Sequence, residues 1–391
     1  MKILITTDWY KPVINGVVTS ILNLASGLRA EGHDVKILTL SDTYHTKTAK
    51  GEYLVGSVPI GMIYPGARYM IPVKHPFLED IIEWRPDVIH SQCEFSSFKL
   101  AKKISKATGA PIVHTYHTVY EDYTHYFSPN KWAGKKAVVT FTRHVAKKTR
   151  AFIVPSKKTY NMLARYDVTI PMYTIPSGID IDRFVKERPA KVKAVREKLG
   201  IRQDECVLIY VGRLAKEKNL EEILDYMKDK RSKRIRLIIV GGGPYQEDLE
   251  DAVIRRNLGD RVVFAGMVKN REIADYYKAG DIFVSASNSE TQGLTYMEAM
   301  ASGLPILCKK DECLDDVIDY GKNGYTFENK EEFLTVLEEL ISNPEKRESV
   351  GKAARKSMIE DFSVEGFAEN CVEVYEEVLH QERIRLEEGV E

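Results

Sequence analysis

The sequence predicts an α/β protein built from two successive doubly wound domains, and three observations lead to that class. The chain has 391 residues, enough for two or three domains at roughly 100–200 residues each. Short apolar runs alternate with helix-like stretches, which is the order of βαβ units and parallel sheets. The alternation pauses in a polar stretch with Pro and Gly at residues 176–204 and then starts again, which predicts a hinge there.

The first set of elements predicts an N-terminal domain at residues 1–175. Its strands read as short, nearly continuous apolar runs, as expected for a parallel sheet that is covered on both faces. The predicted strands are Lys2–Thr7, Val35–Leu40, Asp87–His90, Pro111–Tyr116 and Phe152–Val154. The predicted helices between them are Val17–Ala30, Ser96–Ala107 and Gly134–Thr149.

The second set predicts another domain of the same kind at residues 205–363. Its predicted strands are Cys206–Val211, Ile235–Val240, Val262–Phe264, Asp281–Ser285 and Pro305–Cys308. Its predicted helices are Leu220–Lys228, Tyr245–Arg255, Arg271–Ala279 and Thr295–Ala301. After Phe327 the pattern is helical and charged, and it ends in a strongly acidic helix at about Val364–Leu386.

Composition excludes several classes of protein. Lys plus Arg and Asp plus Glu both number 57, so the net charge is zero, and a protein that works by wrapping nucleic acid would show a basic excess. No apolar run approaches the ~20 residues needed to cross a bilayer, and the N-terminal run is too short for a secretory signal. The five cysteines are scattered and include no Cys-x2-Cys pair, which favours a reducing cytoplasm over a disulfide or zinc scaffold.

One segment of this neutral chain is basic. Between Tyr123 and Tyr166 there is no Asp or Glu, but there are ten Lys or Arg. The predicted helix Gly134–Arg150 would pack an apolar face against the domain, and its basic face is either a solvated surface or a contact with an anionic membrane, the interpretation we favour. The apolar face carries Val138, Phe141 and Val145, and the basic face carries Lys136, Arg143, Lys147 and Arg150.

Two loops of the first domain carry candidate ligand-binding residues. Gly16 follows Asn15 and opens the first helix, where a helix N-terminus favours a phosphate, although a plain turn explains the glycine equally well. His117 follows the strand Pro111–Tyr116, at the edge where open α/β sheets bind ligands. There it can donate a hydrogen bond to a sugar hydroxyl or help a proton to leave, and the alternative is an ordinary loop histidine.

The loops after the first two strands of the second domain favour an anion. Arg213 follows Gly212 directly after a buried strand, and Lys218 stands five residues later, so both can turn toward one diphosphate. The alternative is an exposed charged loop. Gly241, Gly242 and Gly243 follow the next strand and permit close ligand approach, but a simple turn needs them as much.

The segment from Glu290 to Glu298 is the most informative. Gly293 and Leu294 stand where a helix begins, so their N–H groups can bind an anion. Glu290 precedes them in the loop, and Glu298 lies about one turn into the helix. The spacing offers one carboxylate to a sugar, amides to a phosphate and a second carboxylate to a ribose diol.

Taken together, these motifs resemble the retaining GT-B glycosyltransferases of glycosyltransferase family four. The resemblance covers nearly the whole chain, and the combination in this order is specific although each piece is not. It is carried by Asp8, Pro12, Asn15-Gly16-Val17, Thr115-Tyr116-His117-Thr118, Ile175-Pro176-Ser177-Gly178-Ile179-Asp180, Phe184, Gly212-Arg213-Leu214, Glu217-Lys218-Asn219, Gly241-Gly242-Gly243-Pro244 and the Glu290-x7-Glu298 pair.

The resemblance implies two Rossmann-like domains facing a cleft: an acceptor-side domain at 1–175 completed by residues 364–391, and a nucleotide-sugar domain at 205–363. It also implies a metal-independent hexosyltransferase without a cofactor. By position in the motifs, Arg213 and Lys218 would hold the donor diphosphate and Glu298 the ribose. Glu290 would hold sugar hydroxyls, with the amides of Gly293 and Leu294 nearby.

The same likeness places Gly16 against the phosphates and His117 against the transferred sugar. Many relatives carry His-x-His where this chain has His90-Ser91-Gln92, in a loop that points at the acceptor side. The departure lies at Gln92, which stands in place of the second histidine.

A narrower likeness is to bacterial 1,2-diacylglycerol 3-glucosyltransferases, which transfer glucose from UDP-glucose on the cytoplasmic leaflet. It rests on residues His114 to Tyr126 and on the basic helix that follows. It implies a peripheral protein at the inner membrane face, with an interfacial acceptor site walled by Tyr120, Tyr123 and Tyr126 and with Trp132 inserted.

Two other functions stay open from the residues. The first keeps the donor but uses a soluble sugar, a glycolipid or a phosphatidylinositol as acceptor. The second is a dinucleotide-binding oxidoreductase or sensor, which would want Gly-x-Gly-x-x-Gly in the first loop and would leave Glu290 and Glu298 unexplained. No Asp-x-Asp stands in the predicted cleft loops, so we expect cationic side chains rather than a metal to stabilise the leaving diphosphate.

Overall fold

The computed structural model describes residues 1–13, 15–60, 67–71, 75–121, 124, 130–232, 235–287 and 289–389. The chain divides into two compact units. The first joins Met1–Gly178 with the C-terminal segment Val364–Glu391, and the second is continuous from Ile179 to Ser363. The second unit therefore includes most of the stretch 176–204 that the sequence assigned to a hinge.

The first unit is built on a largely parallel sheet whose central strands are buried on both faces. In the described part of the chain the strand order is β10-β9-β8-β7-β1-β2-β4-β3, with β3 antiparallel to β4 at one edge. A separate antiparallel pair is formed by β5 and β6. The bounds are β1 Lys2–Thr6, β2 Asp34–Leu40, β3 Lys47–Ala49, β4 Glu52–Val55, β5 Ser57–Pro59, β6 Arg68–Met70, β7 Val88–Ser91, β8 Ile112–Thr115, β9 Ala151–Val154 and β10 Met172–Thr174.

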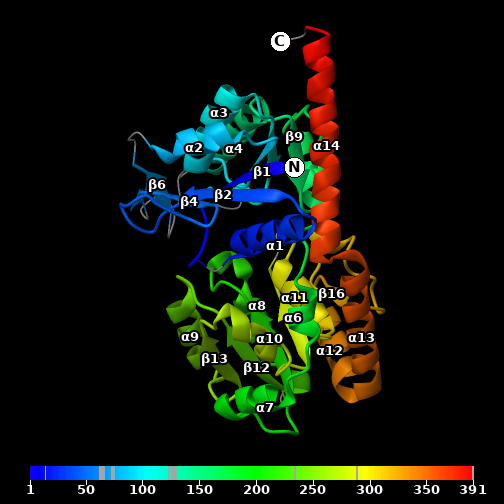
Figure 1. Ribbon diagram of the computed structural model, residues 1–391. Coiled ribbons are helices and arrows are strands. Elements are labelled where there is room, and N and C mark those ends of the chain that lie inside the picture. Colours follow the sequence, from blue (N-terminus) through cyan, green and yellow to red (C-terminus); the bar gives the residue numbers. More distant parts are fainter. Residues whose placement is uncertain are drawn as a thin grey trace. The chain divides into compact units, whose positions relative to one another are not determined.

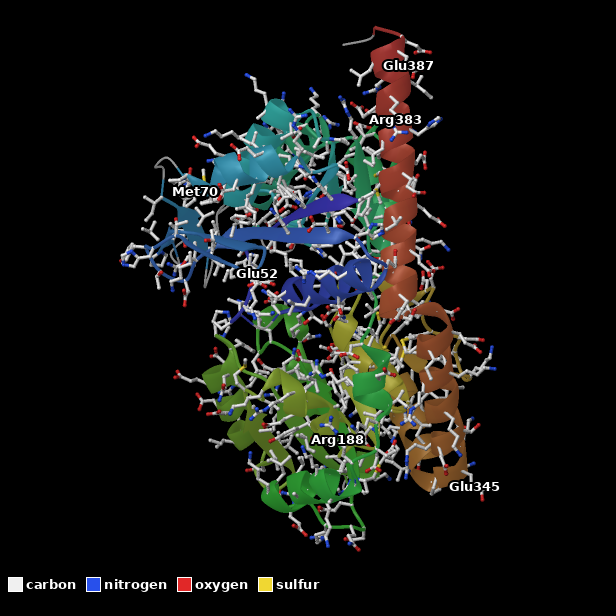
Figure 2. All side chains as sticks on the ribbon, in the orientation of Figure 1. Glu52, Met70, Arg188, Glu345, Arg383 and Glu387 are labelled. Atoms are coloured by element: carbon white, nitrogen blue, oxygen red, sulfur yellow. The ribbon has the colours of Figure 1, made fainter. Side chains whose placement is uncertain are left out.

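The C-terminal helix α14 packs against the first helix α1 and completes this unit (Figure 1). The two helices approach so closely that a Cβ on Gly27 would lie 2.7 Å from the Cβ of Ala368. Figure 2 shows Arg383 and Glu387, both exposed, on the last turns of α14. The helices of the unit are α1 Gly16–Ala30, α2 Phe77–Trp84, α3 Ser96–Thr108, α4 Lys131–Ala146, α5 Lys157–Arg165 and α14 Val364–Glu387.

The second unit repeats the architecture with a parallel sheet of order β13-β12-β11-β14-β15-β16. Its strands are β11 Cys206–Val211, β12 Ile235–Val240, β13 Val262–Gly266, β14 Ile282–Ser285, β15 Ile306–Lys309 and β16 Tyr325–Phe327. Its helices are α6 Ile181–Val185, α7 Pro189–Lys198, α8 Leu220–Tyr226, α9 Gln246–Arg255, α10 Ile273–Tyr277, α11 Leu294–Ala301, α12 Lys330–Ser342 and α13 Pro344–Asp361, with short 3-10 turns at Lys216–Lys218, Lys230–Ser232, Asn270–Glu272 and Glu312–Leu314.

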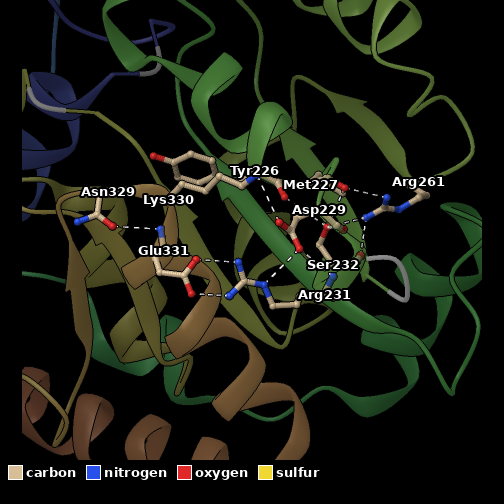
Figure 3. A network of polar contacts seen from close by, with 9 residues as sticks. All are labelled: Tyr226, Met227, Asp229, Arg231, Ser232, Arg261, Asn329, Lys330 and Glu331. Carbon is tan, nitrogen blue, oxygen red and sulfur yellow. Dashed lines mark hydrogen bonds and ion pairs between the residues drawn. The ribbon is translucent and has the colours of Figure 1, made fainter.

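A polar network ties α8 to α12 on the side of this unit where β12 begins (Figure 3). Arg231 donates to both carboxylate oxygens of Glu331, at 2.8 and 2.9 Å, and also pairs with Asp229. Arg261 donates to the carbonyl of Met227 at 2.9 Å. Because these groups bind one another, we assign the network a structural role. The candidate site described below lies at the opposite edge of the sheet, at the carboxyl ends of the strands.

Most predicted elements agree with the structure to within a few residues, and the strand order follows the doubly wound pattern. The sequence missed the short strands β3 to β6, β10 and β16. Strand β3 is exposed along its length and β6 is half-buried, so neither carries the continuous apolar run used to find the others. The C-terminal helix, predicted at Val364–Leu386, is α14.

The predicted helix Gly134–Arg150 is wrong at its C-terminal end, so Arg150 is not on the basic face of the helix. Helix α4 ends at Ala146, and Arg150 leaves the helix because its N–H donates to the carbonyl of Ile112 as the chain enters β9. Arg150 pairs instead with Glu382 of α14 at 2.7 Å, and Arg143 pairs with Asp167. Of the four predicted cations, Lys136 and Lys147 keep exposed positions outside any such ion pair within the described residues.

Candidate active site

Three loops meet at the carboxyl edge of the second unit's sheet, after β11, β12 and β14. Backbone hydrogen bonds join the loops after β11 and β12. One of them runs from the N–H of Leu214 to the carbonyl of Gly242 at 3.0 Å. A Cβ on Gly241 would lie 1.9 Å from the carbonyl oxygen of Gly212, and one on Gly243 would lie 2.2 Å from that of Leu214. The glycines are therefore required for the contact between these two loops.

Lys218 and Glu290 form an ion pair across two of these loops. The Lys218 Nζ donates to Glu290 Oε1 at 2.7 Å, and both side chains are largely buried. Burial alone would lower the pKa of the Lys218 ammonium, but Glu290, Tyr210 and Glu217 together outweigh it and hold that pKa above its ordinary value. The ammonium that the sequence assigned to a diphosphate is thus neutralised here by the carboxylate assigned to a sugar.

Gly293 and Leu294 open α11 as the sequence predicted. Gly293 has φ +81°, a left-handed conformation, and a Cβ there would also meet the Tyr296 ring at 2.6 Å, so only glycine fits. The first N–H groups of α11 have no acceptor within the helix, as at any helix N-terminus. The Tyr296 hydroxyl fixes the start of the helix by donating to Ser285 Oγ at 2.8 Å.

Glu298 stands one turn into α11, also as predicted. Its Oε2 accepts a hydrogen bond from the hydroxyl of Tyr277 on α10 at 2.8 Å. Burial raises the pKa of Glu298, and the Tyr277 hydroxyl opposes this rise by stabilising the carboxylate. The Tyr277 contact orients the carboxylate of Glu298.

Arg213 directly follows Gly212 at the end of β11, and its carbonyl accepts from the Tyr210 hydroxyl at 3.1 Å. Four predicted ligand-binding positions, Arg213, Lys218, Glu290 and Gly293, thus lie in loops at one sheet edge of one unit. The arrangement offers cations, helix N–H groups and carboxylates to a ligand with a charged centre and hydroxyls at its ends.

The first unit gathers a second cluster at the carboxyl ends of β1, β7 and β8. His117 Nε2 lies 2.6 Å from Oε1 of Gln92, and burial lowers the pKa of His117 to about 3. His114 Nε2 pairs with Glu94 Oε1 at 3.2 Å. Gly16 is exposed at the start of α1, which Asn15 caps by accepting the N–H of Val18.

Asp8 and Glu94 are members of this cluster that the sequence did not propose as site residues. Asp8 accepts the N–H groups of Ser97 at 2.8 Å and Phe95 at 3.3 Å, which anchors the start of α3, and burial raises its pKa to about 6. Glu94 accepts from Tyr120 and His114 together. Only the position of Asp8 after the first strand hinted at this, since its partners stand nearly 90 residues away.

The predicted acceptor aromatics fall into two groups. Tyr120 is half-buried and donates to Glu94 Oε2 at 2.5 Å, and its ring packs edge-on against Phe95 and Phe141. Trp132 is 72% exposed at the start of α4, with Lys136 Nζ 5.3 Å from its ring centre. Tyr123 and Tyr126 lie outside the described residues.

A shallow hollow runs along the outer face of α4. It is lined by Trp132, Ala133, Lys136, Ala137, Thr140, Phe141 and His144. Within the described ranges, no set of three or more His, Cys, Asp or Glu side chains is arranged to hold a metal ion. No helix in the same part of the chain is long and apolar enough to span a membrane.

In a comparison with known proteins, each of the two units matches a family model. Residues 14–183 match the family model described as Glycosyltransferase Family 4, and residues 191–357 match the one described as Glycosyl transferases group 1. The chain is 35% identical to alpha-monoglucosyldiacylglycerol synthase of Acholeplasma laidlawii over 99% of both chains. It is 33% identical to the synthase of the same name from Streptococcus pneumoniae, over 96% of this chain and 85% of that one.

Solved structures support the fold. The chain is similar to Anabaena HepE in complex with UDP and glucose, with a TM-score of 0.76 and 18% identity over 96% of this chain and 100% of that one. It is also similar to the sucrose-phosphate synthase of Thermosynechococcus elongatus, with a TM-score of 0.77 and 19% identity over 97% and 99% of the two chains.

Proposed function

Because the chain belongs to glycosyltransferase family 4 and is a hexosyltransferase with the GT-B fold, we propose that it transfers glucose from UDP-glucose to diacylglycerol, with retention at the anomeric carbon. The observation that carries the proposal is the similarity to the Acholeplasma synthase, which extends over 99% of both chains. Such coverage includes the acceptor-side unit as well as the unit with the candidate donor site.

The second unit supplies the groups that this donor needs. The N–H groups at Gly293 and Leu294 and the cations Arg213 and Lys218 would bind the diphosphate. Glu298, oriented by Tyr277, would accept from the ribose hydroxyls. Glu290 would hold sugar hydroxyls.

The proposed chemistry depends on stabilising charge in the leaving group. Negative charge develops on the departing UDP, and positioned cations and helix N–H groups lower that barrier most. Removing Arg213 or Lys218 should therefore lower kcat by about 10²–10³, the scale seen when one such donor is lost. We assign no carboxylate nucleophile; His117 and Gly16 of the first unit would contact the sugar and the phosphates.

A membrane location is the second part of the proposal. Lys136 on α4 and Lys147, the residue after its last turn, contribute about 1 kcal/mol each near an anionic leaflet, which alone is weak binding. The exposed Trp132 ring adds apolar area at the start of the helix, near Lys136 and in the hollow that Phe141 also lines. We propose that this face of α4 lies on the inner leaflet as a peripheral contact.

One assay tests the reaction. The enzyme is incubated with a panel of UDP- and GDP-sugars and diacylglycerol in mixed micelles, and products are read by mass. We expect a monohexosyl diacylglycerol from UDP-glucose. A product formed only with a soluble sugar, or only with phosphatidylinositol, would overturn the acceptor assignment.

A vesicle assay tests the membrane contact. Changing Lys136 and Lys147 to Glu should release the protein from anionic vesicles and leave UDP binding unchanged. The matched control reverses Lys352 and Lys356 on α13, which are exposed and change the net charge equally. If both double variants sediment with vesicles like the wild type, the basic face is only a solvated surface.

A second donor is favoured by one relative. The chain is 29% identical to the sulfoquinovosyl transferase SQD2 of Arabidopsis thaliana over 88% of this chain and 67% of that one. The donor panel therefore includes UDP-sulfoquinovose. If the enzyme accepts this donor and not UDP-glucose, the proposed donor is wrong and the proposed lipid acceptor stands.

A further inference from the structure

The histidines of the first unit's cluster have chemically different partners. His114 faces the carboxylate of Glu94, 3.2 Å away. His90 lies between two hydroxyls, those of Tyr375 at 2.6 Å and Thr115 at 2.7 Å. His117 faces an uncharged amide, because Oε1 of Gln92 stands 2.6 Å from its Nε2. The histidine expected to contact the sugar is thus the one paired with a neutral amide acceptor.

Gln92 is buried where it meets His117, and within the described residues its side-chain Nε2 has no hydrogen-bond partner, so the contact with His117 is made by Oε1 alone. Gln92 directly follows β7, is 2% exposed, and its backbone N–H donates to the carbonyl of Thr6 at 2.8 Å. Its position in sequence is the one where many relatives carry the second histidine of His-x-His. A glutamine there can accept the ring proton of His117 without adding a charge that would stabilise an imidazolium.

The two nitrogens of His117 therefore have different roles. A hydrogen bond to the Gln92 Oε1 requires the proton on Nε2. Within the described residues Nδ1 of His117 has no hydrogen-bond partner. Nδ1 of His114 is also unpaired but is fully buried, whereas Nδ1 of His117 is not among the fully buried unpaired atoms. Nδ1 of His117 then carries a lone pair that no described residue of the protein engages.

We infer that Gln92 is a positioning residue that keeps His117 as the neutral Nε2–H tautomer, so that Nδ1 accepts a hydrogen bond from a substrate hydroxyl. This inference rests on the proposed function only in placing His117 at the substrate. Of the two roles that the sequence left open for His117, it replaces donation to a sugar hydroxyl with acceptance from a substrate hydroxyl. An imidazolium would carry a proton on both nitrogens and offer no acceptor, so protonation of His117 would abolish the contact.

The surroundings agree with a neutral ring. Burial, aided by neighbouring His114, lowers the pKa of His117 to about 3. The other titratable groups of the cluster are Asp8, His90, Cys93, Glu94 and Tyr120, and the carboxylate of Glu94 is already engaged by the His114 ring and the Tyr120 hydroxyl.

The variant Gln92→Glu tests the inference. A carboxylate beside Nε2 should stabilise the imidazolium, and the pKa of His117 should rise. We expect kcat of this variant to fall at least tenfold between pH 8.5 and pH 6. The fall is measured relative to the wild type at each pH, because Asp8 titrates in both proteins and its effect then cancels. The matched control is Gln381→Glu, the same change at an exposed position of α14. Its pH profile should follow the wild type.

A direct measurement needs neither donor nor lipid. In ¹⁵N-histidine-labelled protein, the signals missing from a His117→Gln variant identify the His117 ring. In the wild type they should report a neutral Nε2–H ring between pH 5 and 8, and in Gln92→Glu the ring should titrate in that range. A wild-type ring that titrates there, or carries its proton on Nδ1, overturns the inference even if Gln92→Glu does not fold. Failure to glucosylate diacylglycerol would instead overturn the proposed function and leave this spectrum readable.

Discussion

The ion pair between Lys218 and Glu290 predicts an unusual result: removing a charge from the candidate donor site should tighten nucleotide binding. If Lys218 binds the diphosphate, it must first release or share Glu290, which lies 2.7 Å away. The change Glu290→Gln removes this competitor and a negative charge near the phosphates, while keeping the size of the side chain.

The size of the effect follows from the distance. At 2.7 Å and an effective dielectric constant of about 20, the attraction is roughly 6 kcal/mol, and the desolvation of the two ions offsets most of it. A remainder of about 1–2 kcal/mol corresponds to a 5- to 30-fold tighter Kd for UDP. Turnover of the UDP-sugar should fall about 10- to 100-fold, because the sugar loses a hydrogen bond to a charged group.

Titration calorimetry with UDP measures the first effect and steady-state kinetics the second. The matched control is Glu205→Gln, which removes a buried carboxylate 3.5 Å from Arg236 at the opposite edge of the same sheet. UDP affinity should be unchanged in the control. If Glu290→Gln binds UDP as the wild type does, or more weakly, Lys218 does not exchange Glu290 for the diphosphate and its proposed role is wrong.

Three further results are expected. Glu298→Ala should weaken UDP binding about 10- to 100-fold in calorimetry with the fold intact, and a change under twofold would reject the ribose contact. Gly243→Ala should lower the free energy of unfolding by about 1–3 kcal/mol in urea titrations, because its Cβ would stand 2.2 Å from the Leu214 carbonyl, whereas Gly259→Ala meets nothing within 4 Å and should not. Burial raises the pKa of Asp8 from 3.8 to about 6, so the folded state binds this proton more tightly than the unfolded state does. Protonated Asp8 therefore contributes up to about 3 kcal/mol to the free energy of unfolding below pH 4, and this contribution should be lost as the pH rises through 6. In Asp8→Asn this part of the pH dependence should be absent, and an unchanged slope in denaturant titrations from pH 4 to 7 would contradict the assignment.

The parts of the site that depend on local geometry were predictable from the sequence. Gly293, Leu294 and Glu298 belong to one turn and one helix, so their spacing alone placed the glycine at the helix start and the glutamate one turn later. The doubly wound fold was predictable for the same reason, since buried parallel strands leave a continuous apolar run in the sequence.

The pairings across strands were not predictable. Lys218 meets Glu290 only because β11 and β14 are neighbours in the sheet, and Gln92 meets His117 only because β7 and β8 are. The end of α4 failed for a related reason. No Gly or Pro interrupts the sequence between Gly134 and Arg150. The backbone N–H of Arg150 nevertheless bonds to Ile112 of strand β8, and this sheet pairing outweighs helix propensity.

The return of α14 to the first unit has a consequence for biosynthesis. A nascent chain that has reached Gly178 holds the strands of the first sheet but lacks the helix that covers α1, whereas the second unit is continuous and can fold as soon as it leaves the ribosome. At roughly 5–20 residues per second, tens of seconds pass before α14 is synthesised. During that time the apolar face that will pack on Cys371 and Tyr375 is exposed to chaperones and to aggregation, so the unit made first is the one that is completed last.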